Sequence, residues 1–310
     1  MSEAEGFKSG FVALVGRPNV GKSTLMNAFL REKVAVVSPR PQTTRTRIHG
    51  ILNGEGHQVV FVDTPGVCDN RNALRKAMRA VGGNAAADSD VTLLIVEARR
   101  GEPRVAPEER HLIEAARGNP GGTLLVALNK VDALRDKADM LPWIEVYAQA
   151  SEADAIIPIS ALREDGLQSL LDEILARLPD GPPLFPTDMH TDQAERTMCE
   201  ELIRVQLLLQ LREEVPHSAA VVIEQFDESE REDDGGLVHL EGRIYIERES
   251  QRGIVIGKKG SRIKAVSTAA RHDIEELLGC KVYLRLAVHV DPHWTNKARA
   301  VQNYGIGVEG

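Results

Sequence analysis

The chain has 310 residues, of which 42% are hydrophobic and 27% charged, and its formal net charge is -8. That length exceeds what one compact core usually holds, so two domains are expected, and the acidic balance argues against indiscriminate adhesion to nucleic acid or membrane. Three widely spaced cysteines exclude a disulfide-stapled scaffold, and the absence of an export signal or a membrane-length apolar run predicts a cytoplasmic protein.

The first half of the sequence has the pattern of an α/β fold. Apolar runs separated by helix-like stretches recur between Phe11 and Leu178, and such runs predict the strands of a parallel sheet that is covered on both faces. The segment 178–186 then holds four prolines, which remove hydrogen-bond donors and fix the backbone. We therefore predict a first domain over residues 1–178 and a proline-rich linker over residues 179–191.

A glycine-rich loop follows the first apolar run and reads Gly-Arg-Pro-Asn-Val-Gly-Lys-Ser over residues 16–23. This spacing lets backbone N–H groups and the N-terminus of the next helix face an anion. Lys22 would contact the β- and γ-phosphates of a nucleoside triphosphate, and the Ser23 hydroxyl would ligate Mg²⁺. The predicted phosphate-binding residues are Asn19, Val20, Gly21, Lys22, Ser23 and Thr24.

An aspartate ends the apolar run 59–62, within the sequence Asp63-Thr-Pro-Gly66. A carboxylate at a strand end can hold Mg²⁺ through water, and the Gly66 N–H can reach the γ-phosphate. Alone, this short pattern usually indicates only a turn. It indicates a nucleotide site here because it follows a strand and lies downstream of the glycine-rich loop. The two segments together predict a site that senses the γ-phosphate.

The apolar runs 124–128 and 156–159 also end in residues that suit a nucleotide site. An aspartate carboxylate can accept hydrogen bonds from N1–H and the 2-amino group of guanine, whereas adenine has neither donor, so discrimination of roughly 10⁴-fold is attainable. GTP is therefore predicted rather than ATP, and Asp132 is the residue that reads the base. The predicted base-end residues are Asn129, Lys130, Asp132, Ser160, Ala161 and Leu162.

The order of these motifs and the spelling of residues 16–23 and 63–66 resemble the TrmE–Era–EngA group of GTPases over residues 8–178. The resemblance implies a P-loop GTPase domain with a mixed, mostly parallel sheet covered by helices, which hydrolyses GTP to GDP and phosphate. It also implies Mg²⁺ as a cofactor. The predicted metal-site residues are Ser23, Thr44 (or its neighbour Thr43) and, through water, Asp63.

The same resemblance bears on catalysis. Asn19 matches an asparagine that helps to hold K⁺ near the β–γ bridging oxygen, so K⁺ is expected as a second cofactor. Many GTPases place a glutamine where this chain has Val67, which cannot orient water, so slow unassisted turnover is expected. The catalytic residues implied are Lys22, Asn19, Thr44 and Gly66.

Two segments are expected to order with GTP and loosen after hydrolysis: a first switch segment, residues 38–47, and a second switch segment, residues 66–83. Three arginines lie in the first switch segment, Arg40, Arg45 and Arg47. We interpret them as part of a solvated basic loop rather than as groups with a specific partner.

The second half has a different order of elements. A helix is predicted over 192–214, strands over 219–227, 238–247 and 281–290, and two helices around the turn Gly257-Lys-Lys-Gly260, which gives α-β-β-α-α-β. This unit, residues 192–310 with the C-terminal tail, resembles an α+β type II KH domain. The G-x-x-G turn and its lysines suit a single-stranded nucleic-acid backbone.

Charge supports the same interpretation. Residues 250–272 hold six basic residues and no acidic one, within a half of the chain whose net charge is negative. Such a local basic patch favours a defined RNA path over indiscriminate binding. The predicted RNA-binding residues are Gly257, Lys258, Lys259, Gly260 and Arg262.

A P-loop GTPase followed by this unit resembles the Era family over almost the full length. The resemblance implies a monomeric ribosome-assembly GTPase that binds the 3′ region of 16S ribosomal RNA in the precursor of the small (30S) subunit. It also implies a peripheral contact with the inner face of the cell membrane, for which this sequence offers no basic amphipathic helix.

Two alternatives stay open on the sequence. One is a GTPase of the same group that acts on another RNA or on tRNA modification. The other is a signalling or membrane-associated GTPase whose second domain binds protein, which the basic patch in residues 250–272 opposes.

Overall fold

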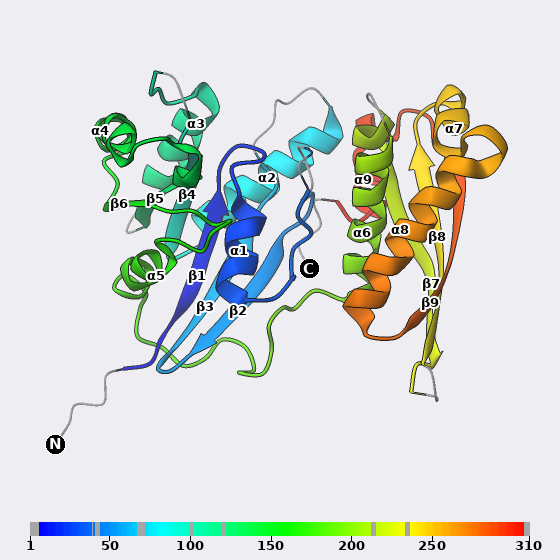
Figure 1. The fold of residues 1–310 in the computed structure, drawn as a ribbon, viewed down its shortest axis with the longest axis horizontal. Helices are drawn as coiled ribbons and strands as arrows, with labels where there is room; N and C mark the ends of the chain where they lie inside the picture. The colour runs from blue at the N-terminus through cyan, green and yellow to red at the C-terminus, as the bar shows by residue number, and fades with distance from the viewer. Residues whose placement is uncertain are drawn as a thin grey trace.

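The computed structural model describes residues 6–38, 40, 44–66, 72–99, 102–118, 122–211, 215–232 and 236–306. They form two bodies that lie side by side, one on a six-stranded sheet and one on a three-stranded sheet (Figure 1). An extended segment runs below the first body and connects the two.

The six-stranded sheet is mixed and mostly parallel, as predicted. Its strands are β1 (Lys8–Val15), β2 (Ile48–Gly54), β3 (His57–Asp63), β4 (Val91–Glu97), β5 (Thr123–Asn129) and β6 (Ala155–Pro158). They lie in the order β2-β3-β1-β4-β5-β6, and only β2 is antiparallel to its neighbour. The carboxyl ends of the five parallel strands therefore meet at one edge, where α/β sheets bind their ligands.

Helices cover both faces of this sheet. On one face lie α1 (Lys22–Leu30) and α5 (Leu167–Leu175), and on the other lie α2 (Ala73–Ala87), α3 (Pro107–Arg117) and α4 (Leu141–Ser151). Each face has its own apolar core, which includes Phe29 and Phe61 on the α1 side and Trp143 and Tyr147 on the α4 side. Burial on both faces explains why the strands read as continuous apolar runs.

The second body has the predicted order α-β-β-α-α-β. Its elements are α6 (Glu195–Gln210), β7 (Ala220–Glu230), β8 (Leu237–Ile246), α7 (Glu249–Ile256), α8 (Ser261–Leu278) and β9 (Lys281–Val290). The sheet order is β7-β8-β9, with β7 antiparallel and β9 parallel to β8. A further helix, α9 (Ala298–Asn303), follows. Short 3₁₀ turns occupy Val131–Ala133, Lys137–Met140, Val215–Ser218, Lys258–Gly260 and Trp294–Asn296.

The helix predicted over 192–214 is shorter, because its first residues bind elsewhere. The Thr191 hydroxyl donates to the carbonyl of His49 over 2.7 Å, and the Gln193 amide donates to the carbonyl of Arg47 over 2.8 Å. These bonds hold the chain extended beside β2, so α6 begins only at Glu195. The apolar side of α6, with Cys199, Ile203 and Leu207, packs into the core of the second body.

The proline-rich segment is fixed to the first body along its length. The buried Gln58 side chain accepts hydrogen bonds from the N–H groups of Leu184 and Phe185, over 2.6 and 2.9 Å. Further along, the Ile51 N–H donates to the carbonyl of His190 over 2.8 Å. The segment therefore covers the outer edge of β2, the edge strand of the sheet.

An apolar cluster joins the two bodies. Leu74 and Met78 on α2 pack with Trp294, Val301 and other residues that follow β9. Trp294 is fully buried, and its indole N–H donates to the carbonyl of Ser218 over 2.8 Å. This contact was not predicted, because a helix of six residues leaves too short a periodic pattern to detect.

Trp294→Ala should lower the free energy of unfolding by about 3–5 kcal/mol, since a large buried side chain would leave a cavity. Urea unfolding checks this. Tyr283→Ala is the matched control, because that ring is 54% exposed and its loss should cost less than about 0.5 kcal/mol. Equal effects of the two substitutions would contradict the assigned burial.

Candidate nucleotide site and nucleic-acid interface

The loop between β1 and α1 has the backbone that its glycines allow. Gly21 has a φ of 105°, and a Cβ there would lie 2.4 Å from the Asn129 amide nitrogen. Asn19 also has a positive φ, of 65°. Because the loop curls back on itself before α1, its N–H groups and the N-terminus of α1 face the cavity at the strand ends.

The Lys22 ammonium lies inside this curl, with the residue 7% exposed. It donates to the carbonyls of Gly16 and Arg17 over 3.4 and 3.1 Å. Burial lowers the pKa of Lys22, and the negative charge of Asp63 opposes that shift. Lys22 therefore presents a partly desolvated cation where the loop would surround phosphate groups.

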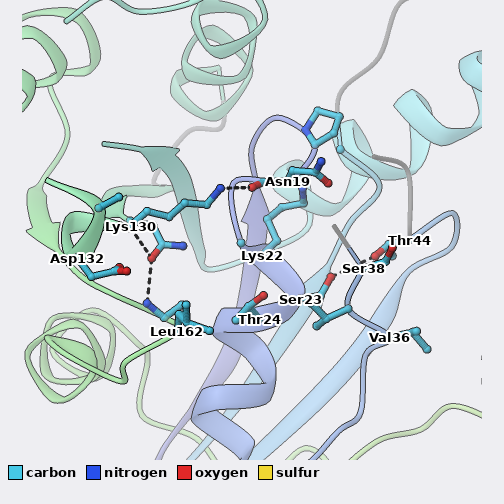
Figure 2. Close-up of a pocket in the computed structure, with 17 residues that line it drawn as sticks. Asn19, Lys22, Ser23, Thr24, Val36, Ser38, Thr44, Lys130, Asp132 and Leu162 are labelled. Atoms are coloured by element: carbon cyan, nitrogen blue, oxygen red, sulfur yellow. Dashed lines mark hydrogen bonds between the residues drawn. The ribbon is translucent and has the colours of Figure 1, made fainter. Parts of the chain in front are cut away.

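Three oxygen-bearing side chains converge beside Lys22. The Ser23 hydroxyl donates to Oδ2 of Asp63 over 2.5 Å, and the Thr44 hydroxyl donates to the same oxygen over 3.2 Å. The Ser23 and Thr44 oxygens are themselves 3.2 Å apart (Figure 2). These residues come from α1, from the segment before β2 and from the end of β3.

This cluster fits Mg²⁺. Asp63 is fully buried, and its Oδ1 atom has no hydrogen-bond partner among the residues that the structure describes. Burial raises the pKa of Asp63, while Lys22 and the hydrogen bonds from Ser23 and Thr44 lower it. A buried carboxylate oxygen beside two hydroxyls is the all-oxygen donor set that Mg²⁺ prefers.

The base end is tied to the loop by Asn129, which is 2% exposed. Its amide donates to the carbonyl of Val20 over 2.8 Å, and its oxygen accepts the N–H groups of Lys130 and Ala161 over 2.8 and 2.9 Å. The Lys130 ammonium donates to the carbonyl of Asn19 over 2.7 Å. Asn129 and Lys130 therefore hold together the two loops that would contact the phosphates and the base.

The carboxylate of Asp132 points into the same cavity. Ser160 donates to its Oδ1 atom over 2.6 Å, which fixes the carboxylate orientation. Leu162 lies at the cavity mouth and is 79% exposed, and its side chain and Lys130 border the space next to Asp132. A planar base could be held there with its edge toward the carboxylate.

A cavity of about 580 Å³ brings most of the predicted residues together. Val20, Asp63 and Ser160 are not part of its lining, and all three are buried. The lining also includes five residues that were not predicted as site residues, although Pro18 lies within the glycine-rich loop and Ser38 within the first switch segment. These are Pro18, Val36, Val37, Ser38 and Ala133.

Parts of both switch segments fall outside the described residues, among them Thr43 and Val67, so their predicted roles stay predictions. Gly66 lines the cavity, and a Cβ there would lie 2.8 Å from the backbone nitrogen of Pro18. This close approach requires glycine. It keeps the Gly66 backbone against the phosphate loop, where its N–H is predicted to act.

In the second body, the G-x-x-G turn joins α7 to α8 and contains three residues with positive φ. Gly257 has a φ of 72°, Lys259 of 51° and Gly260 of 77°. A Cβ on Gly257 would lie 2.8 Å from the Arg262 side chain, so the turn can be this tight only without one. The lysines at its centre are exposed.

The basic patch is on the surface, as predicted. All six basic residues of 250–272 are exposed, although Arg252 forms an ion pair with Glu249 and Arg262 donates to the carbonyl of Ile254 over 3.1 Å. Lys258 and Lys259 form no ion pair within the described part of the chain. They remain free to contact phosphate groups.

Two protein-family models match the chain, one in each body. Residues 11–130 match the family model described as 50S ribosome-binding GTPase, and residues 214–295 match the KH domain model. The chain is 42% identical to GTPase Era of Syntrophus aciditrophicus, in an alignment that covers 96% of this chain and 95% of the relative. It is 43% identical to GTPase Era of Geobacter metallireducens, over 96% of this chain and 98% of the relative.

Solved structures give the same result over both bodies. A point variant of Aquifex aeolicus Era bound to GDP and aluminium fluoride matches with a TM-score of 0.88. Era in complex with MgGDPNP and nucleotides 1506–1542 of 16S ribosomal RNA matches with a TM-score of 0.89. Each is 36% identical to this chain and covers 96% of it and 99% of the solved chain. Because the likeness extends through the nucleotide site, the KH unit and the connection between them, the chain belongs to the Era family of GTPases.

Proposed function

We propose that this GTPase is a nucleotide-controlled RNA-binding protein that acts in assembly of the small ribosomal subunit by binding the 3′ region of 16S ribosomal RNA. The observation that carries the proposal is the convergence of Ser23, Thr44 and Asp63 beside the phosphate loop, in a chain that also presents an exposed G-x-x-G turn. The solved Era complex with MgGDPNP and 16S ribosomal RNA nucleotides supports it.

Each side chain then has a defined task. Lys22 binds the β- and γ-phosphate oxygens, and the Gly66 N–H binds the γ-phosphate. Ser23 and Thr44 would ligate Mg²⁺, with Asp63 behind them holding its water, and the ion would supply positive charge that offsets the charge of the phosphates. The protein's own contribution is to fix these groups in advance, so that little reorganisation is needed in the transition state.

The KH unit supplies the second half of the function. Gly257 and Gly260 allow a nucleic-acid backbone to approach, and Lys258, Lys259 and Arg262 surround the turn with positive charge. Among the described helices, none combines the length and apolar character needed to span a membrane. We propose a cytoplasmic monomer. The peripheral membrane contact stays a prediction from the family.

Asp132→Asn should weaken GTP binding by roughly 10²–10⁴-fold, because two hydrogen bonds to a charged group are lost. The same variant should bind xanthosine triphosphate better than GTP, since an amide can donate to the 2-oxo group of xanthine. Competition binding with the two nucleotides checks this. Asp139→Asn, an exposed aspartate outside the cavity lining, is the control. Unchanged preference in Asp132→Asn would contradict the assignment.

We propose K⁺ as the second cation, with Asn19 as its protein contact at the cavity lining. Replacing K⁺ with Na⁺ at equal ionic strength should lower kcat by about tenfold or more, because a positive charge near the bridging oxygen would be lost. Asn19→Ala should make the rate equally slow in both salts. Equal rates of the unaltered protein in the two salts would exclude K⁺ from catalysis.

Lys258→Asp/Lys259→Asp should abolish preferential binding to an oligonucleotide of the 16S ribosomal RNA 3′ region over a scrambled one. If each lysine makes one phosphate contact, the slope of log affinity against log salt should also fall by about 1.4. Fluorescence anisotropy with GDPNP or GDP present checks both expectations. We expect the affinity of the unaltered protein to differ between the two nucleotides.

Arg104→Asp/Arg110→Asp is the control for charge, because it makes the same change in net charge at two exposed sites in the first body. It should leave RNA binding unchanged. Equal, weak binding of both oligonucleotides by the unaltered protein would overturn the RNA-binding proposal and favour a protein partner for the KH unit.

A further inference from the structure

Arg45, in the first switch segment, is buried where the two bodies meet. The residue is 3% exposed, and Glu201 and Arg204 on α6, whose charges act on it, are 7% and 4% exposed. The interpretation of Arg45 as part of a solvated basic loop is therefore wrong, whereas Arg40 is exposed. Because a buried guanidinium has lost its hydration, it must be compensated by specific contacts.

Arg45 contacts the second body through a hydrogen bond to its backbone. The Nη1 atom of Arg45 donates to the carbonyl of Ala219, just before β7, over 2.7 Å, and both residues are buried. Since the donor is charged and the bond is shielded from water, it is stronger than an exposed bond between neutral groups. Arg45 therefore attaches its part of the first switch segment to the start of β7.

The acceptor carbonyl is itself held in place. Ala219 is fully buried in the core of the second body. The carbonyl of Ser218, one residue earlier, accepts the indole N–H of Trp294 over 2.8 Å. Ala220, one residue later, belongs with Trp294 and Leu74 of α2 to the apolar cluster between the bodies. Because the residues on both sides are fixed, the Ala219 carbonyl can position the group that donates to it.

The residue before Arg45 belongs to the nucleotide site. The Thr44 hydroxyl lies 3.2 Å from both Asp63 Oδ2 and Ser23 Oγ (Figure 2). Neighbouring Cα atoms are only about 3.8 Å apart, so a shift at Arg45 also moves Thr44. The structure thus combines two features in one arrangement of this segment: the Thr44 hydroxyl lies at the oxygen cluster, and Arg45 reaches the second body.

From these contacts we infer that Arg45 is a positioning residue for GTP binding and hydrolysis, which holds the adjoining Thr44 in its ligating orientation by docking on the Ala219 carbonyl. The inference rests on the proposed role of Thr44 as a ligand of Mg²⁺ and the γ-phosphate. GDP has no γ-phosphate, so the contact favours GTP over GDP and does not set nucleotide affinity as a whole. A backbone carbonyl of the RNA-binding body thus helps to form the metal site of the other body.

Arg45→Met tests the inference in the full-length protein, because methionine fills much of the same buried space but donates no hydrogen bond. With Mg²⁺ present, affinity for GDPNP and the single-turnover rate of GTP hydrolysis should each fall about tenfold, the effect of one charge-assisted hydrogen bond, while affinity for GDP is almost unchanged. Arg45→Lys keeps a charged donor and should recover part of the loss. Isothermal titration and single-turnover hydrolysis give these values.

Removal of Mg²⁺ provides a readout that general loosening of the structure would not give. Because Arg45 acts through a ligand of the ion, the unaltered protein and Arg45→Met should bind GDPNP within about twofold of each other when EDTA is present. A loss in Arg45→Met that persists without Mg²⁺ would contradict the positioning role. An equal loss of GDP and GDPNP affinity would also contradict it.

Lys33→Met is the matched control. Lys33 also bridges the two bodies, in an exposed ion pair with Glu276 of 2.6 Å, and its loss should change neither nucleotide affinity nor the rate of hydrolysis. A loss with Lys33→Met as large as with Arg45→Met would show that any weakened contact between the bodies has this effect, and the inference would fail.

Thr44→Ala separates this inference from the proposed function. If Arg45 acts through Thr44, Thr44→Ala/Arg45→Met should bind GDPNP no more weakly than Thr44→Ala alone. Additive losses would overturn the positioning role and leave the role of Thr44 intact. Unchanged GDPNP affinity in Thr44→Ala itself would instead overturn the proposed metal site.

Discussion

The buried carboxylate of Asp63 is the constraint on which the nucleotide site depends. A carboxylate with no exposed surface must find donors or a cation inside the protein. Ser23 and Thr44 supply the donors, and they come from two segments that are otherwise independent in the chain. Asp63 therefore sets the spacing between the phosphate loop, the first switch segment and the end of β3, and its Oδ1 atom is left without a hydrogen-bond partner among the described residues.

The same need for compensation operates between the two bodies. Arg45, Glu201 and Arg204 are buried where a purely apolar interface would be simpler, and removing one partner would leave a charge without solvent or counter-ion. The apolar cluster around Trp294 buries surface without imposing one geometry on polar atoms. The interface thus has two parts. The part at the second switch segment is apolar and adaptable, whereas the part at the first switch segment is charged and tolerates few arrangements.

Sequence was sufficient where chemistry requires fixed residue types at fixed spacing. The loop around Lys22 and the carboxylate at Asp132 were predicted from the chemistry of phosphate and guanine, and the apolar runs and strand periodicity located every strand of the two sheets except β2. The sequence was insufficient where the structure depends on contacts between segments that are distant along the chain. The interpretation of Arg45 as part of a solvated basic loop is wrong, because this residue is 3% exposed and its guanidinium donates to the carbonyl of Ala219, 174 positions away. The burial of Trp294 likewise depends on a helix of the other body.

The docking of the proline-rich segment against β2 has a consequence for how the molecule can move. Since residues 184–193 are hydrogen-bonded to β2 and β3, they cannot act as a loose tether. The first place where the chain can turn freely is just before Glu195, beside the start of β2 and only a few residues from Thr44. Any rotation of the RNA-binding body about this point therefore pivots close to Thr44, and a small angular change there becomes a large displacement at the far G-x-x-G turn.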